Sequence, residues 1–310
     1  MNNSFKVSNL NNFADRKNIK TPKIYFLGKD NKLYPENSSK NIFRIINGNV
    51  PEKVEIPGVT RDFNVGLDIY MIGDLHLLIV PKKKCCSLYQ STKITENQAL
   101  QSSIKAIIKN LQRAYPNRNI YFVEHGSGFL NKKKTTCGTS LSVIQAHGHF
   151  FVPPFDKQPN FQEVEKKVNQ ALKDVGWKDL SKRSVKNKSL IPPCYERIFN
   201  KTSNRLGQKV SYDYPYLHVG MVKPSGEEVS RIYIKKSPEE QTPSQLMRKI
   251  MSDLFYGEKP EVWWDWKKAL QIKESGISDL NLRRRLNNIS KARNDFKNRL
   301  MSTSSKEFFA

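Results

Sequence analysis

The segment 141–152 constrains the fold of this chain most strongly, because its residue types alternate with a period of two. Residues two apart on a β-strand point to the same face, so Gln145, His147 and His149 project together. Three apolar residues have the other parity and point to the opposite face: Ile144, Phe150 and Val152. The alternation therefore predicts a half-buried strand that presents two imidazoles and an amide in one row.

Strand patterns and amphipathic helix patterns alternate along the rest of the chain. Strands are expected at 23–28, 41–46, 63–80 (two strands that break near Gly73), 120–125, 212–222 and 231–236. Helices are expected where apolar residues recur three or four apart, at 95–111, at 161–175 and from about residue 242. This order of elements indicates an α+β protein in which helices pack on an antiparallel sheet.

Residue chemistry marks where two of these helices begin. Thr95 is a suitable N-cap for the first helix, and Pro116 follows the end of that helix. The later helix has Thr242 as N-cap, Pro243 at the first helical position and Gln245 three residues after the cap. We therefore expect the later helix to begin at Pro243.

Composition divides the chain into three parts. Residues 1–22 are polar and aperiodic, which predicts a flexible arm, and residues 23–266 hold the elements of one main domain. Residues 267–310 form a basic tail whose apolar residues recur at helical spacing: Leu282, Leu286, Ile289, Phe296 and Leu300. We expect a helix at 278–300 that docks on the domain through its apolar face and can bind RNA, DNA or an acidic partner through its arginines.

The charge of the chain is strongly unbalanced. With 53 Lys and Arg against 29 Asp and Glu, the formal net charge is +24 at pH 7. One explanation is attraction to nucleic acid, nucleotides or another polyanion. The other is compositional, because the sequence is rich in Lys, Asn and Ile. The clustering of the basic residues favours the first explanation.

Hydropathy and cysteine usage exclude other classes of protein. A run of eighteen apolar residues is absent and residues 1–20 lack an apolar stretch, so we expect neither a membrane span nor a signal peptide. The four cysteines are scattered without metal-ligand spacing, which is typical of a reducing compartment such as the cytoplasm.

The row formed by Gln145, His147 and His149 admits three kinds of chemistry: it could bind a metal, bind a phosphate or attack phosphorus. Zinc needs three or four ligands, and the other histidines lie in separate segments, so no metal is expected. No cofactor is expected either. His76 and His218 lie within apolar strand patterns, which indicates packing roles. The structural alternative for the row is a pair of satisfied polar side chains in a half-buried strand.

The row resembles the signature of the histidine-triad (HIT-like) superfamily, in which three histidines alternate with other residues before an apolar pair. Here Gln145, His147 and His149 precede Phe150 and Phe151. Four further segments resemble family motifs, in the family's order: LHLLIVPKK (75–83), FVEHG (122–126), PSQLMR (243–248) and WDW (264–266). The resemblance covers roughly 63–266, so it implies that 23–266 is a HIT-like domain with insertions. Such domains are often homodimers.

The resemblance implies a nucleotidyl hydrolase or transferase. The middle histidine is the family's nucleophile and falls on His147, which would attack the α-phosphorus of a nucleotide. His149 would hydrogen-bond a non-bridging phosphate oxygen, and Ser142 matches a family position that binds the phosphate or the leaving oxygen. Gln145 departs from the family's first histidine and cannot carry a proton, which leaves the reaction type open.

Four further residues are candidates for holding the phosphate chain of the substrate: Lys82, Glu124, His125 and Arg248. Asp68 or Asp74 could accept ribose hydroxyls, as an acidic residue does in many family members. The charge points to a nucleotide attached to nucleic acid as one possible substrate. The alternative function is a module with an impaired triad, which binds nucleic acid or nucleotide within a nucleoprotein assembly.

Overall fold

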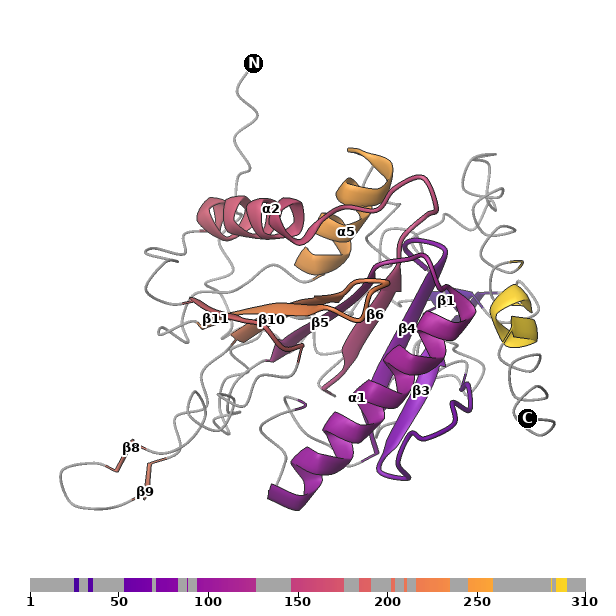
Figure 1. Ribbon diagram of the computed structural model, residues 1–310, viewed down its shortest axis with the longest axis horizontal. Coiled ribbons are helices and arrows are strands. Elements are labelled where there is room, and N and C mark those ends of the chain that lie inside the picture. The colour runs from indigo at the N-terminus through magenta and orange to yellow at the C-terminus, as the bar shows by residue number, and fades with distance from the viewer. Residues whose placement is uncertain are drawn as a thin grey trace, which may run out of the picture.

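The structure is a computed structural model of the 310-residue chain (Figure 1). It describes residues 25–27, 33–35, 53–68, 71–82, 88, 94–126, 146–175, 184–190, 202–203, 209–210, 216–234, 245–258, 291 and 294–299. The predicted strand at 41–46 and residues 1–22 lie outside these ranges, so their predictions stay untested.

A seven-stranded sheet organises the described part of the chain, and every neighbouring pair in it is antiparallel. Its order is β3-β4-β6-β5-β10-β11-β7. The strands are β3 Phe63–Leu67, β4 Leu75–Pro81, β6 Gly148–Val152, β5 Ile120–Gly126, β10 Tyr216–Val222, β11 Glu228–Ile234 and β7 Ser184–Asn187. Together with the helices below, this sheet confirms the predicted α+β class.

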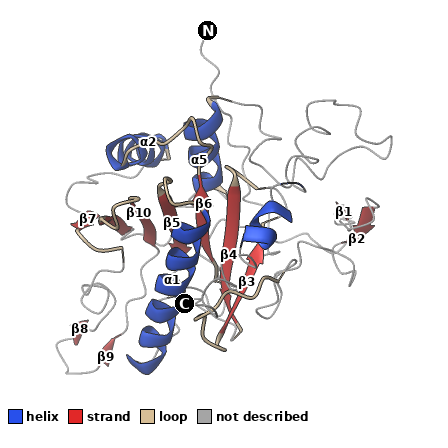
Figure 2. Ribbon diagram, turned by 45° about the vertical axis from the view of Figure 1, so that its right-hand side comes forward, coloured by secondary structure: helices blue, strands red, loops and turns tan. Residues whose placement is uncertain are grey.

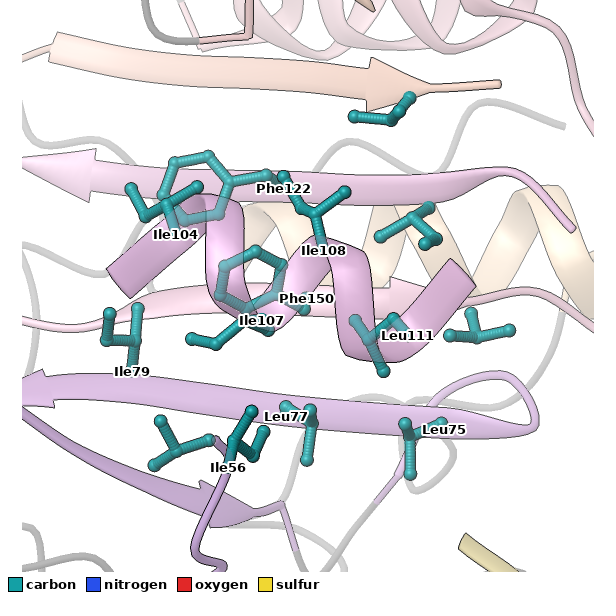
Figure 3. Packing of buried hydrophobic residues seen from close by; sticks show 14 of the residues in the cluster. Ile56, Leu75, Leu77, Ile79, Ile104, Ile107, Ile108, Leu111, Phe122 and Phe150 are labelled. Atoms are coloured by element: carbon teal, nitrogen blue, oxygen red, sulfur yellow. The ribbon is translucent and has the colours of Figure 1, made fainter. Parts of the chain in front are cut away.

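One face of the sheet is covered by α1, Ile94–Ala114. Five apolar residues predicted to share a helix face are all buried: Leu100, Ile104, Ile107, Ile108 and Leu111. They belong to the same apolar cluster as Phe122 of β5 and Phe150 of β6 (Figure 3). The helix and the alternating strand residues thus bury each other's apolar sides.

The other face packs against α2, Phe161–Asp174, and α5, Leu246–Tyr256, which contact each other (Figure 2). Asn160 begins α2 with a capping box, because its side chain accepts the N–H of Glu163 while Glu163 accepts the N–H of Asn160. Five residues of α5 join the apolar cluster on this face: Leu246, Met247, Ile250, Met251 and Phe255. Both faces of the sheet are therefore buried by helices.

Two predicted boundaries are wrong in the described part. Helix α5 begins at Leu246, and its N-cap is Gln245 with φ 64°, without a side-chain capping bond. Thr242 and Pro243 lie outside the described residues, so their predicted capping roles stay untested. Strand β6 begins at Gly148 and not before His147, because its pairing with β4 and with β5 ends at Gly148 on both sides.

The short strands differ from expectation in several places. The predicted strand at 23–28 contains β1, Tyr25–Leu27, which pairs with β2, Leu33–Pro35. The unassigned segment 177–210 contains β7 and a small pair formed by β8, Thr202–Ser203, and β9, Lys209–Val210. Their short length explains why they leave no clear periodicity in the sequence.

Part of the predicted tail helix lies against the C-terminal end of α1. Residues 294–299 are helical, and the Phe296 ring is fully buried and stacks on Tyr115, with ring centroids 6.3 Å apart. Arg299 donates a hydrogen bond to the carbonyl of Ala114 in the last turn of α1, at 2.9 Å. Phe296 therefore packs on this end of α1, while the other four apolar residues of the predicted helix lie outside the described residues, so the helix at 278–300 stays a prediction.

Among the described residues, none of the helices has both the length and the apolar character needed to cross a bilayer.

The glycine between the two histidines offers a test of this packing. A Cβ at Gly148 would lie 2.7 Å from Cε2 of Phe122 and 3.0 Å from Cδ1 of Leu88. We expect Gly148→Ala to lower the free energy of unfolding by about 1–3 kcal/mol, the range for overpacking a core. Denaturant unfolding measures this loss. Phe122→Leu in the same chain should relieve part of it, and strictly additive effects of the two substitutions would contradict the contact.

Candidate functional site

Three histidines form a row on the face of the sheet that α5 covers. His149 lies in β6 opposite Leu78, and His76 lies in β4 opposite Phe151, so the two histidines occupy neighbouring rungs of one face. Nε2 of His76 lies 2.8 Å from Nδ1 of His149, within hydrogen-bond distance. The ring of His147, which directly precedes β6, meets His149 edge to face with centroids 4.8 Å apart.

Burial keeps the two inner imidazoles neutral. His76 is fully buried, whereas His149 and His147 are half-buried. Burial, and then the positive charge of Arg248, lowers the pKa of His76 well below 6.5. Burial, followed by the neighbouring His147 and then Arg248, lowers the pKa of His149 in the same direction. Both rings are therefore uncharged near pH 7 and can act as hydrogen-bond donor and acceptor at once.

An ion pair lies behind the histidine row. Nη1 of Arg248, in the first turn of α5, lies 2.6 Å from Oδ2 of Asp68, which follows β3. The same Nη1 lies 3.4 Å from Nδ1 of His76 and forms a hydrogen bond with it. Asp68 lies opposite His76 on the neighbouring strand, because its N–H donates to the carbonyl of His76. Residues that are 180 apart in the sequence thus meet at one imidazole.

Asp68, His76 and His149 are also the described residues that come close enough together to hold a metal ion, with ligand atoms within 4.8 Å of one another. Their geometry fits hydrogen bonding better. His149 contacts Nε2 of His76, whereas Asp68 is on the side of Nδ1, so one ion cannot use both contacts to the ring. Arg248 moreover already neutralises Asp68.

His125 and Lys82 lie on the face that carries the histidines. The β5–β6 register ends at Glu124↔Gly148, so His125 and His147 are the next residues along the two strands. His125 is half-buried. Lys82 is exposed at the end of β4, where its N–H donates to the carbonyl of Asp62, and strand alternation gives it the same face as His76. A phosphate-binding role stays a prediction for both.

Glu124 differs from its predicted position beside a phosphate. Strand alternation directs it to the α1 face, where it lies opposite His218, and both side chains are fully buried. Oε1 of Glu124 accepts the N–H of Leu88 at 2.7 Å. Its carboxylate therefore packs beneath the sheet and holds the backbone at Leu88, while the histidine row lies on the other side.

Arg248, which was predicted to contact a phosphate, lies behind the histidine row. The residue is 4% exposed, and its side chain engages Asp68 and His76 behind the row. The other predicted site residues, Gln145 and Ser142, lie outside the described residues, as does the WDW segment at 264–266.

Sequence reasoning assigned His76 to packing and considered Asp68 only for ribose binding. The signal was present, because His76 is the one polar residue within LHLLIV. Its partner could not be inferred, since the order of the strands decides which segment lies beside β4. Asp74, the other residue considered for ribose, pairs with Arg118 at 3.1 Å.

The buried histidines predict acid sensitivity. Burial lowers the pKa of His218 to about 3, from 6.5. Its neutral form thus contributes fully to stability above pH 6.5, and this contribution is lost as the pH falls from 6.5 towards 3. The loss is about 1.4 kcal/mol per pH unit. In denaturant unfolding between pH 6.5 and 4, His218→Gln should show a shallower decline of unfolding free energy than the parent chain. Parallel declines would contradict this.

Comparison with known proteins assigns no family. No protein-family model matches this chain, and no curated protein matches it either.

Proposed function

We propose that this chain is a nucleotidyl hydrolase or transferase of the histidine-triad kind, with His147 as the nucleophile that attacks a nucleotide α-phosphate. The observation that carries the proposal is the row His147, His149 and His76, in which a half-buried imidazole lies next to two neutral ones. A neutral imidazole such as His149 carries one N–H that can donate to an anionic phosphate, which is a property that such a site needs.

The reaction would run in two steps. The lone pair on Nε2 of His147 forms a bond to the α-phosphorus while the bond from phosphorus to the leaving oxygen breaks. The leaving oxygen departs as an anion or takes a proton from solvent, because Gln145 has no titratable proton to give. Water or another acceptor hydroxyl then bonds to phosphorus, the P–N bond breaks, the acceptor proton is released, and His147 returns to its starting form.

His149 would stabilise the charge that develops on phosphorus. Its ring lies next to that of His147, so a donor nitrogen on it can reach a non-bridging oxygen of the same phosphate. Donors aimed at such oxygens contribute about 3–4 kcal/mol to the transition state. His125 and Lys82 share this face and are the candidates for the rest of the phosphate chain.

A basic binding module is the second candidate, and the distribution of charge favours it. The net charge is +24, and the outer side of α1 carries Lys105, Lys109 and Arg113, all exposed and spaced four residues apart. Such a stripe can follow a phosphate backbone. The two functions are compatible, because α1 covers the face of the sheet opposite the histidine row.

The enzyme proposal is tested by trapping the intermediate. The protein is incubated with nucleoside triphosphates labelled at the α-phosphate, and with capped or 5′-adenylated oligonucleotides that carry the label. We expect an acid-labile, base-stable labelled protein, since a phosphorus–nitrogen bond has this stability. His147→Asn should abolish the label, whereas His218→Gln, on the other face, should retain it. Turnover that persists in His147→Asn would reject His147 as the nucleophile.

The binding module is tested by salt dependence. If the stripe on α1 contacts phosphates, replacing Lys105, Lys109 and Arg113 by Gln should weaken binding of a single-stranded oligonucleotide. Each lost phosphate contact changes the slope of log affinity against log salt by about 0.7–0.9, so the three replacements together should make the slope shallower by roughly two to three. Fluorescence anisotropy between about 50 and 200 mM salt measures both quantities. An unchanged slope would place the contact elsewhere.

A further inference from the structure

We propose that Arg248 is a positioning residue that fixes the tautomer of His149 through His76, so that His149 presents an N–H to the substrate. The inference deepens the proposed function and rests on it in one respect, namely that His149 donates to a phosphate oxygen. It is carried by three contacts in series: Asp68 to Arg248, Arg248 to His76, and His76 to His149.

Arg248 determines which group donates and which accepts in each hydrogen bond of the series. A guanidinium has only donors, so the nitrogen that it contacts at 3.4 Å, Nδ1 of His76, must accept. A neutral imidazole carries one proton, and burial keeps His76 neutral. The proton of His76 is therefore on Nε2.

The next contact transmits this choice. Nε2–H of His76 lies 2.8 Å from Nδ1 of His149 and donates to it. Nδ1 of His149 is then the acceptor, which leaves the single proton of His149 on Nε2. His149 consequently offers an N–H on the side of its ring away from His76, as a donor to phosphate requires.

Asp68 alone would impose the opposite arrangement. A carboxylate only accepts, so if it bonded Nδ1 of His76 the proton would move to that nitrogen. His76 would then accept from His149, and Nε2 of His149 would carry a lone pair that repels a phosphate oxygen. Oδ2 of Asp68 lies 3.6 Å from Nδ1 of His76, beyond hydrogen-bond distance, and 2.6 Å from Arg248. Arg248 thus forms an ion pair with Asp68 and also donates a hydrogen bond to His76.

Burial protects this arrangement. His76 is fully buried and Arg248 is 4% exposed, so solvent cannot replace the guanidinium as the donor to Nδ1. A buried arginine without a carboxylate would be costly, which assigns Asp68 the role of compensating and orienting Arg248.

Nitrogen-15 NMR tests the proposal directly. The chain has five histidines, so two-bond proton–nitrogen correlations of ¹⁵N-histidine-labelled protein give a small set of ring signals. We expect both His76 and His149 to carry their proton on Nε2. In Arg248→Met, Asp68 remains beside Nδ1 of His76, and both protons should move to Nδ1. Arg248→Lys retains a donor and should keep the parent pattern.

Arg231→Met is the matched control. Arg231 forms an ion pair of the same length, 2.6 Å to Glu165, on the same face of the sheet, but does not contact His76 or His149. In Arg231→Met, His76 and His149 should carry their protons on the same nitrogens as in the parent chain. A proton on Nδ1 of His149 in the parent chain overturns the proposal without any variant. The proposal is also overturned if Arg248→Met, shown by its thermal melt to be folded, keeps the tautomers of the parent chain.

Kinetics separate this proposal from the proposed function. Arg248→Met should lower kcat about 100-fold, the loss expected when one donor to the transition-state oxygens is removed, with a smaller change in KM. Arg231→Met should not change kcat. A parent chain without nucleotide turnover would overturn the proposed function, while the tautomer shift would still uphold the hydrogen-bond series. A tautomer shift that leaves kcat unchanged would overturn the catalytic consequence alone.

Discussion

The hydrogen bond between His76 and His149 is the contact on which the site depends. It exists because β4 and β6 are neighbours with Leu78 opposite His149, a pairing that brings two imidazoles from distant segments onto adjacent rungs. A shift of this register by one residue would turn His149 towards α1. The apolar residues that alternate with the histidines, such as Phe150 beneath α1, therefore also specify where the histidines point.

The sequence predicted those parts of the fold in which local pattern decides the outcome. The buried side of α1, the strands at 63–80 and the pair β10–β11 follow from apolar periodicity and turn residues. The predicted start of α5 at Pro243 was wrong because Gln245, directly before Leu246, takes a left-handed conformation, which a right-handed helix does not run through. The short strands β7 to β9 carry too few residues for a period to emerge.

The candidate site was predictable only in its central segment. His147 and His149 come from one period-two run, so their proximity follows from sequence. The contribution of Asp68 and Arg248 does not, because it depends on the order of strands and on the docking of α5. Glu124 illustrates the converse, since it is adjacent in sequence to His125 and points to the opposite face. Residues that are brought together only by tertiary packing have no characteristic spacing in the sequence.

The separation of Asp68 and Arg248 along the chain has a consequence for biosynthesis. A ribosome makes β3, β4 and β6 well before α5, so a nascent chain contains the histidines without their arginine. During that interval His76 has no guanidinium beside Nδ1 and lacks the cover that α5 provides, so solvent can reach the ring. The proposed arrangement of protons can therefore be fixed only after α5 docks, which couples the maturation of the site to the arrival of a segment 180 residues after Asp68.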